Sequence, residues 1–245
     1  MQDQNDPVAA QESLYNLPYH WFPEPWLKQF EREEKKRIIY SLIKSHLNGN
    51  MHRYLDVGCG DGRWTSDIHD LIQNKMGQSV ETTGIDFSDR AIGFAKLIKP
   101  GINFQVSRGE DIPYPNAYFD FVSSIEVIEH VEDKSEQHFL SELHRVTHKN
   151  GLVIITTPSW NLRLPEHHFR HYTIERMTEL VQSVDFQILE VRGQSIPYYY
   201  RPLRMLRKVL EGFPKIWRLW KITYKEVAPE KALNLFFALG HKQTK

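Results

Sequence analysis

Residues 54–64 of the chain read Tyr-Leu-Asp-Val-Gly-Cys-Gly-Asp-Gly-Arg-Trp, and this stretch decides the fold. A short apolar run ends at Asp56. Three glycines then follow at alternate positions, Gly58, Gly60 and Gly62, before a segment of helical character. This order predicts a buried strand, a tight turn whose glycines let a ligand lie against the backbone, and a helix N-terminus. The turn lacks the lysine of a phosphate-binding loop and the glycine spacing of a dinucleotide fingerprint.

A second acidic residue marks the end of another apolar run. Asp86 lies within residues 84–88, Gly-Ile-Asp-Phe-Ser, thirty residues after Asp56. In an open α/β sheet, ligands bind outside the carboxyl ends of the strands, where an acidic residue ending the second strand reaches ribose hydroxyls. Asp86 is therefore predicted to contact a ribose, with Phe87 beside the base. The alternative is a surface turn followed by a helix cap at Ser88.

The pattern Asp56-x-Gly58-x-Gly60-x-Gly62 resembles the first motif of the class I S-adenosylmethionine (SAM)-dependent methyltransferases, and the resemblance covers roughly residues 52–192 and the closing strand. It implies an α/β, Rossmann-like fold: a seven-stranded, mostly parallel sheet with helices on both faces and a helical lid insertion. It also implies SAM as the cofactor. The residues expected to bind it are Asp56, Gly58, Gly60, Asp86, Phe87, Gly109, Glu110 and Ser124.

One segment departs from the family pattern. Residues 107–115 resemble the family segment near the adenine, where a backbone N–H and often an aspartate carboxylate pair with the ring edge. The usual aspartate position holds Arg108. Glu110 or Asp111, or the backbone groups of Gly109 and Glu110, are expected to take its place.

Length and composition suit one soluble α/β domain with additions. The chain has 245 residues, of which 40% are hydrophobic and 25% charged, as in ordinary globular proteins. No run approaches eighteen apolar residues, so no spanning helix is expected. Residues 1–12 lack an apolar core, which argues against a secretory signal. Cys59 is the only cysteine, which excludes disulfide and cysteine–zinc frameworks and fits a reducing, cytoplasmic setting.

The order of predicted elements gives two parts. Residues 1–25 form an N-terminal segment, disordered over 1–13 and aromatic afterwards, which either packs on the domain or closes as a lid. In the lid reading, Tyr19, His20 and Trp21 contact the substrate. Residues 26–245 form the methyltransferase domain. Helices are predicted near 26–47, 63–75, 88–98, 134–148 and 173–183, and strands near 53–57, 80–85, 102–106, 118–124, 152–157, 186–191 and 233–240.

An acid–histidine cluster follows the fourth and fifth predicted strands. In a helix, Glu126, Glu129 and His130 would share one face. His168 follows the fifth strand at the same edge of the sheet, so it can converge on them, and His171 is expected to line the acceptor site. Two carboxylates with imidazoles make a plausible Mg²⁺ or Mn²⁺ site.

Two subfamilies share this pattern. The Glu-x-x-Glu-His run resembles the small-RNA 3′-terminal 2′-O-methyltransferases, in which two glutamates and two histidines hold Mg²⁺. It is also similar to the O-methyltransferases of quinone biosynthesis and to small-molecule relatives that use no metal. Three interpretations therefore stay open: a metal site, a metal-free histidine base, and packed structural histidines.

Residues 194–231 form a basic, aromatic insertion. From residue 193 to residue 245 the chain carries eleven Lys and Arg against three Asp and Glu, although the net charge of the whole chain is zero. Basic residues interleaved with tryptophan suit an anionic membrane surface, which would make the protein peripheral and favour a lipid-linked substrate. They also suit RNA. A lid with a solvated basic face is the third interpretation.

The expected activity is SAM-dependent O-methylation of a small-molecule, glycan or lipid-linked acceptor. In this hypothesis Glu126, Glu129, His130 and His168 position or deprotonate the acceptor hydroxyl, with or without a metal. The alternatives are metal-assisted 2′-O-methylation of RNA 3′ ends, and a SAM-binding subunit without catalysis.

Overall fold

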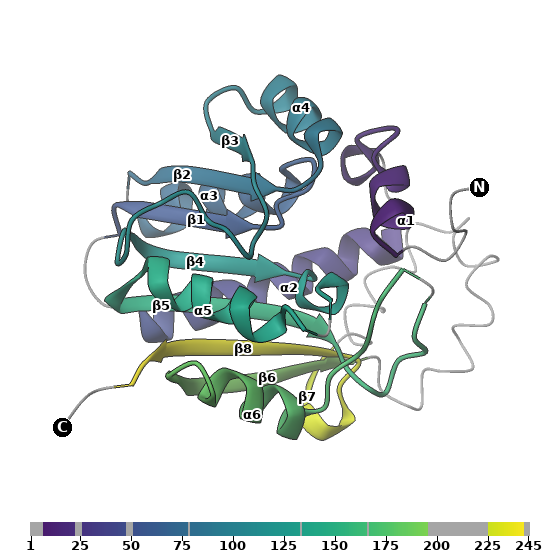
Figure 1. Ribbon diagram of the computed structural model, residues 1–245, viewed down its shortest axis with the longest axis vertical. Helices are drawn as coiled ribbons and strands as arrows, with labels where there is room; N and C mark the ends of the chain where they lie inside the picture. The colour runs from purple at the N-terminus through teal and green to yellow at the C-terminus, as the bar shows by residue number, and fades with distance from the viewer. Residues whose placement is uncertain are drawn as a thin grey trace.

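The computed structural model describes residues 7–22, 26–47, 51–77, 79–132, 134–165, 167–195 and 225–242. Within these ranges eight strands form one sheet in the order β3-β2-β1-β4-β5-β8-β6-β7 (Figure 1). The strands are β1 Arg53–Val57, β2 Glu81–Asp86, β3 Asn103–Val106, β4 Phe119–Ile125, β5 Thr147–Pro158, β6 Phe186–Ser195, β7 Lys225–Val227 and β8 Asn234–His241. The helices are α1 Pro7–Leu14, α2 Trp26–His46, α3 Arg63–Met76, α4 Asp89–Ile98, α5 Glu136–Val146 and α6 Ile174–Gln182.

The sheet is parallel from β3 to β5, and β8 runs antiparallel to both β5 and β6. The predicted mostly parallel α/β fold is therefore confirmed. The count of seven strands is not, because the short β7 adds an eighth strand by pairing antiparallel with β6 at the edge. Part of this edge, up to Ser195 and from Lys225 on, falls in the predicted insertion. The rest of that insertion, residues 196–224, lies outside the described residues.

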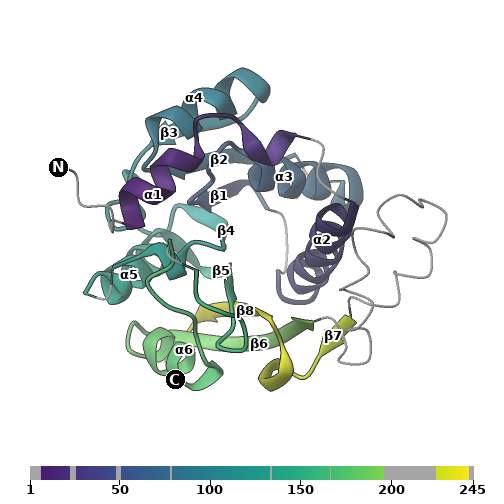
Figure 2. The same cartoon turned by 90° about the vertical axis from the view of Figure 1, so that its right-hand side faces the viewer.

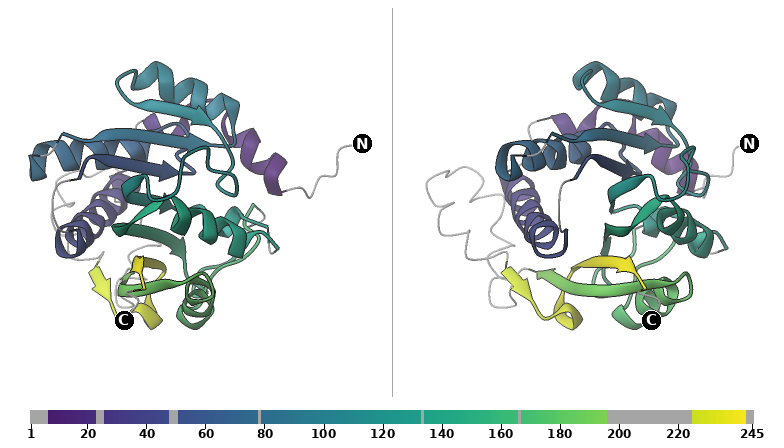
Figure 3. Two further views of the ribbon diagram at one scale, coloured as in Figure 1. Left: turned by 60° about the vertical axis from the view of Figure 1, so that its left-hand side comes forward. Right: turned by 90° about the vertical axis from the view of Figure 1, so that its left-hand side faces the viewer.

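Two apolar layers fix the helices on the sheet. One layer contains Leu55 and Val57 of β1 and packs under α5 and α6. The other contains Tyr54 of β1 and packs under α2 and α3 (Figures 2 and 3). Side chains alternate between the two faces of a strand, so a strand that is apolar throughout is covered on both. None of the helices in the described parts of the chain is long and apolar enough to cross a membrane.

The order of the strands places the binding edge. The chain runs outward from β1 through β2 to β3, and then returns to place β4 on the other side of β1. The carboxyl ends of β1 and β4 therefore flank the point where the strand order reverses, which is where open α/β sheets bind ligands. Figure 2 looks onto these strand ends, and α1 crosses in front of them.

The N-terminal segment is more ordered than expected. The prediction of disorder over residues 1–13 is wrong for residues 7–13, because helix α1 spans Pro7–Leu14. The single-turn 3₁₀ helix Tyr19–Trp21 follows it. Tertiary contacts with the glycine turn, described below, stabilise a segment that lacks a strong apolar periodicity of its own.

The glycine turn needs its glycines for two reasons. Gly58, Gly60 and Gly62 have φ values of 77°, 53° and 79°, a region that residues with a Cβ rarely adopt. At Gly62 an added Cβ would also lie 2.8 Å from Cζ of Phe104 and 3.0 Å from Cβ of Ala95. The close approach of α3 to β3 and α4 therefore depends on the missing side chain.

Replacing Gly62 with alanine tests this constraint. We expect Gly62→Ala to lower the free energy of unfolding by about 1–3 kcal/mol, because it adds both backbone strain and a clash. Gly93→Ala is the matched control, since Gly93 lies within α4 and its added Cβ would meet nothing within 4 Å. That change should stabilise the protein by about 0.5–1 kcal/mol. Equal effects in urea titrations would contradict the packing argument.

Candidate active site

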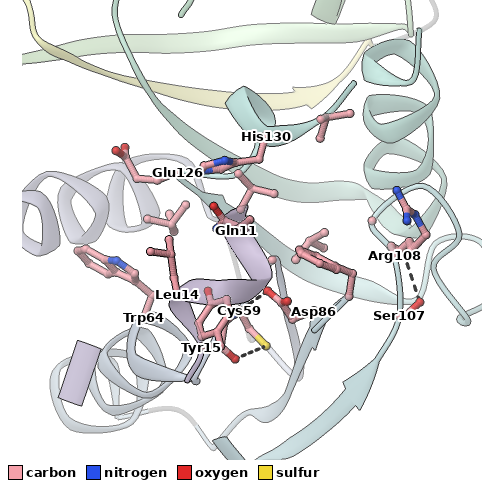
Figure 4. Close-up of a pocket in the computed structure, with 18 of the residues that line it drawn as sticks. Gln11, Leu14, Tyr15, Cys59, Trp64, Asp86, Ser107, Arg108, Glu126 and His130 are labelled. Atoms are coloured by element: carbon pink, nitrogen blue, oxygen red, sulfur yellow. Dashed lines mark hydrogen bonds between the residues drawn. The ribbon is translucent and has the colours of Figure 1, made fainter. Parts of the chain in front are cut away.

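A cavity of about 250 Å³ opens at the carboxyl edge of the sheet (Figure 4). Its walls come from the N-terminal segment, the glycine turn with the start of α3, the residues after β2, the segment after β3, the segment after β4, α5 and the loop after β5. The predicted site residues on these walls are Gly58, Gly60, Asp86, Phe87, Gly109, Glu110, Glu126 and His130, together with Tyr19 and His20 of the N-terminal segment.

Asp86 is held by backbone amides at the rim of the cavity. Its Oδ2 accepts a hydrogen bond of 2.8 Å from the N–H of Gly60, and its Oδ1 accepts one of 2.9 Å from Ser88. Burial raises the pKa of Asp86 to about 6, and the two amide hydrogen bonds oppose this rise. Each oxygen keeps a further lone pair for a ligand. The side chain of Ser88 caps α4, as the alternative expected, and the contact of Asp86 with a ribose stays a prediction.

Asp56 lies behind the cavity, not on its wall. Its carboxylate accepts hydrogen bonds from Oγ1–H of Thr65 on α3 at 2.6 Å and from Oγ–H of Ser123 on β4 at 2.5 Å. Burial raises its pKa to about 6. Ser124 is likewise fully buried and does not line the cavity. The structure thus assigns Asp56 a supporting position, because its carboxylate is already bonded between two elements.

The departure at Arg108 has a structural answer. Its guanidinium Nη2 lies 3.7 Å from Oε1 of Glu110, and both residues line the cavity with Gly109. An added Cβ on Gly109 would lie 2.4 Å from Cε2 of Phe139. A side chain at position 109 would therefore collide with α5, and the chain keeps its backbone close to the cavity there.

Glu126, Glu129 and His130 do not lie in an α-helix. Glu126 has a left-handed φ of 58° directly after β4, and one 3₁₀ turn, Ile128–His130, follows. The condition for placing the three side chains on one helix face is therefore not met. Tertiary structure brings together a different set, since ligand atoms of Glu129, His130 and His168 lie within 4.8 Å of one another.

Glu126 is held apart from this set by a buried lysine. Nζ of Lys35, on α2, lies 3.4 Å from Oε2 of Glu126, and Oγ1–H of Thr156 donates to Oε1 at 3.0 Å. Burial acts to lower the pKa of Lys35, but the carboxylates of Glu126 and Glu31 raise it above its ordinary value. The ammonium therefore stays charged and holds the Glu126 carboxylate at the cavity wall.

The hydrogen bonds of the histidines fix their tautomers. Nδ1 of His130 lies 2.8 Å from the carbonyl oxygen of His167, and Nδ1 of His171 lies 3.2 Å from that of Leu162. A carbonyl only accepts, so both Nδ1 atoms carry a proton. Nε2 of neutral His171 then accepts from Nδ1–H of His168 at 2.9 Å. The Nε2 atoms of His130 and His168 are left with free lone pairs.

The electrostatics keep this set neutral. Burial lowers the pKa of His130 to about 4 and that of His168 to about 3. Burial raises the pKa of Glu129 well above its ordinary range, and the carboxylate of Glu126 adds to this. Oε1 of Glu129 has no hydrogen-bond partner within the described ranges. Two imidazole lone pairs thus converge on one buried carboxyl group, whose Oε1 is unpartnered within the described ranges and whose raised pKa favours the protonated, neutral form.

The loop that carries His168 is anchored by ionic contacts. Glu136 of α5 is 2% exposed and lies 2.8 Å from Nη1 of Arg170. The hydroxyl of Tyr172 donates to the same carboxylate. The N–H of Phe169 donates to the carbonyl of Glu129 at 2.9 Å. These contacts hold the loop against the 3₁₀ turn, so the position of the histidines is set by residues outside the cavity.

Asp61 docks the N-terminal segment on the glycine turn. Its buried carboxylate accepts from the backbone N–H of His20 at 3.1 Å and lies 3.0 Å from Nδ1 of that histidine. Its carbonyl accepts from Nε1–H of Trp21 at 2.8 Å. Tyr19 and His20 line the cavity, but Trp21 does not, because its ring lies under the guanidinium of Arg63.

Sequence reasoning missed several wall residues, and it placed Asp56, Ser124, Trp21 and His171 in a site whose cavity they do not line. His171 supports His168 and does not line the cavity, whereas Gln11 and Tyr15 do. Gln11 and Tyr15 lie four residues apart, so they share one helix face, and that spacing was the available signal. Lys35 was also detectable, because it lies three residues before the buried Ile38 on the apolar stripe of α2.

Comparisons with known proteins agree with this geometry. A family model described as a methyltransferase domain matches residues 55–155. The ubiquinone/menaquinone biosynthesis C-methyltransferase UbiE of Geotalea daltonii is 34% identical over 143 residues, 55% of this chain and 57% of that protein. The ubiquinone biosynthesis O-methyltransferase of Rhizobium etli is 30% identical over 151 residues, 56% of this chain and 57% of that protein.

Solved structures show the same fold. Phosphoethanolamine N-methyltransferase 2 of Haemonchus contortus, in complex with SAM, aligns with a TM-score of 0.59 at 17% identity, over 83% of this chain and 52% of that one. The chain spans about half to three fifths of the length of the curated relatives it matches, between 50% and 61% for the first four. The names of these relatives include C-, O- and N-methyltransferases, so the comparisons leave the accepting atom open.

The lowered histidine pKa values predict a pH-dependent stability. The unfolded histidines bind protons below pH 6.5, their ordinary pKa, while His130 and His168 of the folded chain do so only near pH 4 and pH 3. The contribution of these two histidines to stability is therefore fully present above about pH 6.5 and is lost as the pH drops below it. Urea titrations between pH 7 and pH 5 should show a smaller loss for His168→Gln than for the unaltered protein.

The exposed His52 supplies the control for this experiment. The variant His52→Gln should keep the full pH dependence. An unchanged slope for His168→Gln would mean that this imidazole is not held neutral by its burial.

Proposed function

We propose that the chain is a class I SAM-dependent methyltransferase and that it transfers the methyl group of SAM to a hydroxyl of a small-molecule, glycan or lipid-linked acceptor. The observation that carries the proposal is the composition of the cavity walls. Gly58, Gly60 and Asp86 line one part, and His130 with a free imidazole lone pair lines another. A methyl donor and an acceptor can therefore meet inside one cavity.

The proposed chemistry asks little of the protein beyond alignment and proton removal. The sulfonium carbon of SAM is already activated, so the cavity aligns an in-line attack at about 3–3.5 Å. An attacking hydroxyl must also lose its proton, and the unprotonated Nε2 of His130 is the candidate base. Glu126, held by Lys35 and Thr156, is a fixed hydrogen-bond acceptor that can orient the hydroxyl.

A metal-assisted version of this chemistry is supported by a separate observation. The free lone pairs of His130 and His168 and the unpartnered Oε1 of Glu129 fit a divalent cation. Such an ion would act as a Lewis acid and make the acceptor hydroxyl easier to deprotonate. Two imidazoles with one carboxylate suit Mn²⁺ or a later transition metal better than Mg²⁺. Glu126 is left out of this set because its carboxylate is paired with Lys35.

The acceptor class is argued from the relatives and from the cluster. Several relatives are named for ubiquinone biosynthesis, which favours a small, lipid-linked phenol for this chain. Methylation of RNA 3′ ends, through the same cluster, is the alternative. Contact with an anionic membrane through the basic insertion remains part of the proposal. Residues 196–224, which would form this contact, lie outside the described residues.

A methyl-transfer assay tests the proposal. Radiolabelled SAM should give labelled product with a quinone-precursor phenol, and the rate should change little between 50 and 200 mM salt. Labelling of an RNA oligonucleotide with a steep loss at high salt would favour the alternative, since phosphate contacts make affinity salt-dependent. SAM binding without transfer to any acceptor would point to a subunit that has lost catalysis.

Asp86→Ala should weaken SAM binding by about 1–3 kcal/mol in calorimetry, because charge-assisted hydrogen bonds to the ribose are lost. The control is Asp89→Ala, because Asp89 lies three residues later, in the first turn of α4. This variant should bind SAM with nearly the affinity of the unaltered protein. Unchanged affinity in Asp86→Ala would remove Asp86 from the cofactor site.

Metal titration tests which residues bind a metal. The structure brings together Glu129, His130 and His168, whereas the sequence predicted a set that also includes Glu126. We expect the unaltered protein to bind Mn²⁺, and calorimetry or electron paramagnetic resonance would measure this binding. His168→Ala should abolish Mn²⁺ binding without changing the affinity for SAM. Glu126→Gln should retain Mn²⁺ binding, because Lys35 already pairs with that carboxylate. Loss of Mn²⁺ in Glu126→Gln would restore the set that includes Glu126, and no binding by the unaltered protein would favour the histidine base.

A further inference from the structure

Helix α1 carries two buried oxygen atoms for which the described part of the chain offers no partner. Oε1 of Gln11 and Oε2 of Glu12 are inaccessible to solvent and accept no hydrogen bond within the described residues. Leaving such an atom unpaired is unfavourable, because the oxygen has given up its hydrogen bonds to water without replacing them. Gln11 lines the cavity, and Figure 4 shows its side chain between His130 on one side and Asp86 on the other.

The position of α1 is fixed by the glycine turn. Asp61 binds the segment that follows the helix, as described above. Tyr15 is 4% exposed, and its hydroxyl oxygen lies 2.5 Å from where a Cβ of Gly60 would be. The side chain of Gln11 therefore enters the cavity from a helix that is packed directly on the predicted cofactor turn.

The surroundings of Gln11 are rich in acceptors and poor in cations. Glu12 raises the pKa of Asp86 through its charge, which places the two carboxylates near each other. The two arginines that line the cavity are engaged elsewhere, Arg63 over the ring of Trp21 and Arg108 beside Glu110. This part of the cavity wall therefore favours a ligand that brings positive charge or polarised hydrogens.

SAM brings such a centre, and its demethylated product does not. The sulfonium of SAM is cationic and polarises the C–H bonds of its methyl group, whereas the thioether sulfur of S-adenosylhomocysteine is neutral. A carbonyl oxygen interacts favourably with a nearby cation and with polarised C–H groups. SAM and S-adenosylhomocysteine thus differ at the sulfur centre. A side-chain carbonyl that lies between the cofactor-binding wall and the acceptor-binding wall would contact this centre.

We propose that Gln11 is a specificity-determining residue of the cofactor site: its side-chain carbonyl, with the carboxylate of Glu12 behind it, binds the sulfonium centre and makes the cavity prefer SAM to S-adenosylhomocysteine. The inference rests on the proposed function. It gives the N-terminal segment a role in ligand exchange, because methyl transfer removes the charge that Gln11 binds and so weakens retention of the product.

Calorimetry with SAM and with S-adenosylhomocysteine on the full chain tests this inference. The quantity measured is the ratio of the two dissociation constants. Gln11→Met keeps the length of the side chain and removes the amide with its carbonyl oxygen, so the preference for SAM should fall roughly three- to tenfold. Gln11→Glu adds a charge and should shift the ratio in the opposite direction. Glu12→Gln should reduce the preference in the same sense as Gln11→Met.

Gln182→Met is the matched control, because Gln182 is an exposed residue on α6 and its replacement should leave the ratio unchanged. Thermal unfolding without ligand gives a second readout. Gln11→Met should not lower the unfolding temperature, because the lost oxygen has no partner in the unliganded protein.

The outcomes distinguish this inference from the proposal on which it rests. If the unaltered chain binds both ligands and Gln11→Met weakens both equally, Gln11 is only a packing residue and the inference is overturned. An unchanged ratio in Gln11→Met and Gln11→Glu overturns it as well. If the unaltered chain binds neither ligand, the proposed function itself fails, and the inference fails with it.

Discussion

The buried carboxylate of Asp56 is the contact on which the site depends. It accepts hydroxyl hydrogens from Thr65 on α3 and Ser123 on β4, so it joins the strand before the glycine turn, the helix after it and the neighbouring strand. Ser123 is in turn hydrogen-bonded to the hydroxyl of Tyr54. A carboxylate inside a protein needs such partners, since without them its burial would be costly. The hydrogen bonds of Asp56 thus stabilise the conformation of the glycine turn that follows it, which leaves the glycines available for ligand contact.

Each further wall of the cavity is held in the same way by polar contacts outside it. Asp61 holds the N-terminal segment, and Glu136 holds the loop with His168 through Arg170 and Tyr172. Lys35 holds Glu126. By contrast, Oε1 of Gln11, on the cavity wall, and Oε1 of Glu129, beside His130, lack a hydrogen-bond partner within the described residues. Such a division, with rigid support and unsatisfied walls, suits a site that is completed by its ligands.

The acid–histidine cluster shows how one charge changes the chemistry of a motif. The run Glu126-x-x-Glu129-His130 is compatible with two carboxylate ligands, but the ammonium of Lys35 occupies the place beside Glu126 that a cation would otherwise take. Only Glu129 remains to join His130 and His168. The same motif on another scaffold, without this lysine, would present a different ligand set. The presence of this motif in a sequence is therefore weak evidence for a particular metal site.

The sequence by itself determined the parallel α/β core and the cofactor edge, because these follow from local signals. Apolar runs end at Asp56 and Asp86, and glycines follow where positive φ is needed, so neighbouring residues carry the information. Only the tertiary structure decided that residues 7–13 are helical, that Glu126 pairs with Lys35, and that Gln11 enters the cavity. These features depend on contacts between residues far apart in the chain, for example 41 positions between His20 and Asp61. Periodicity and motif spacing describe one segment at a time, and they cannot report which segments will meet.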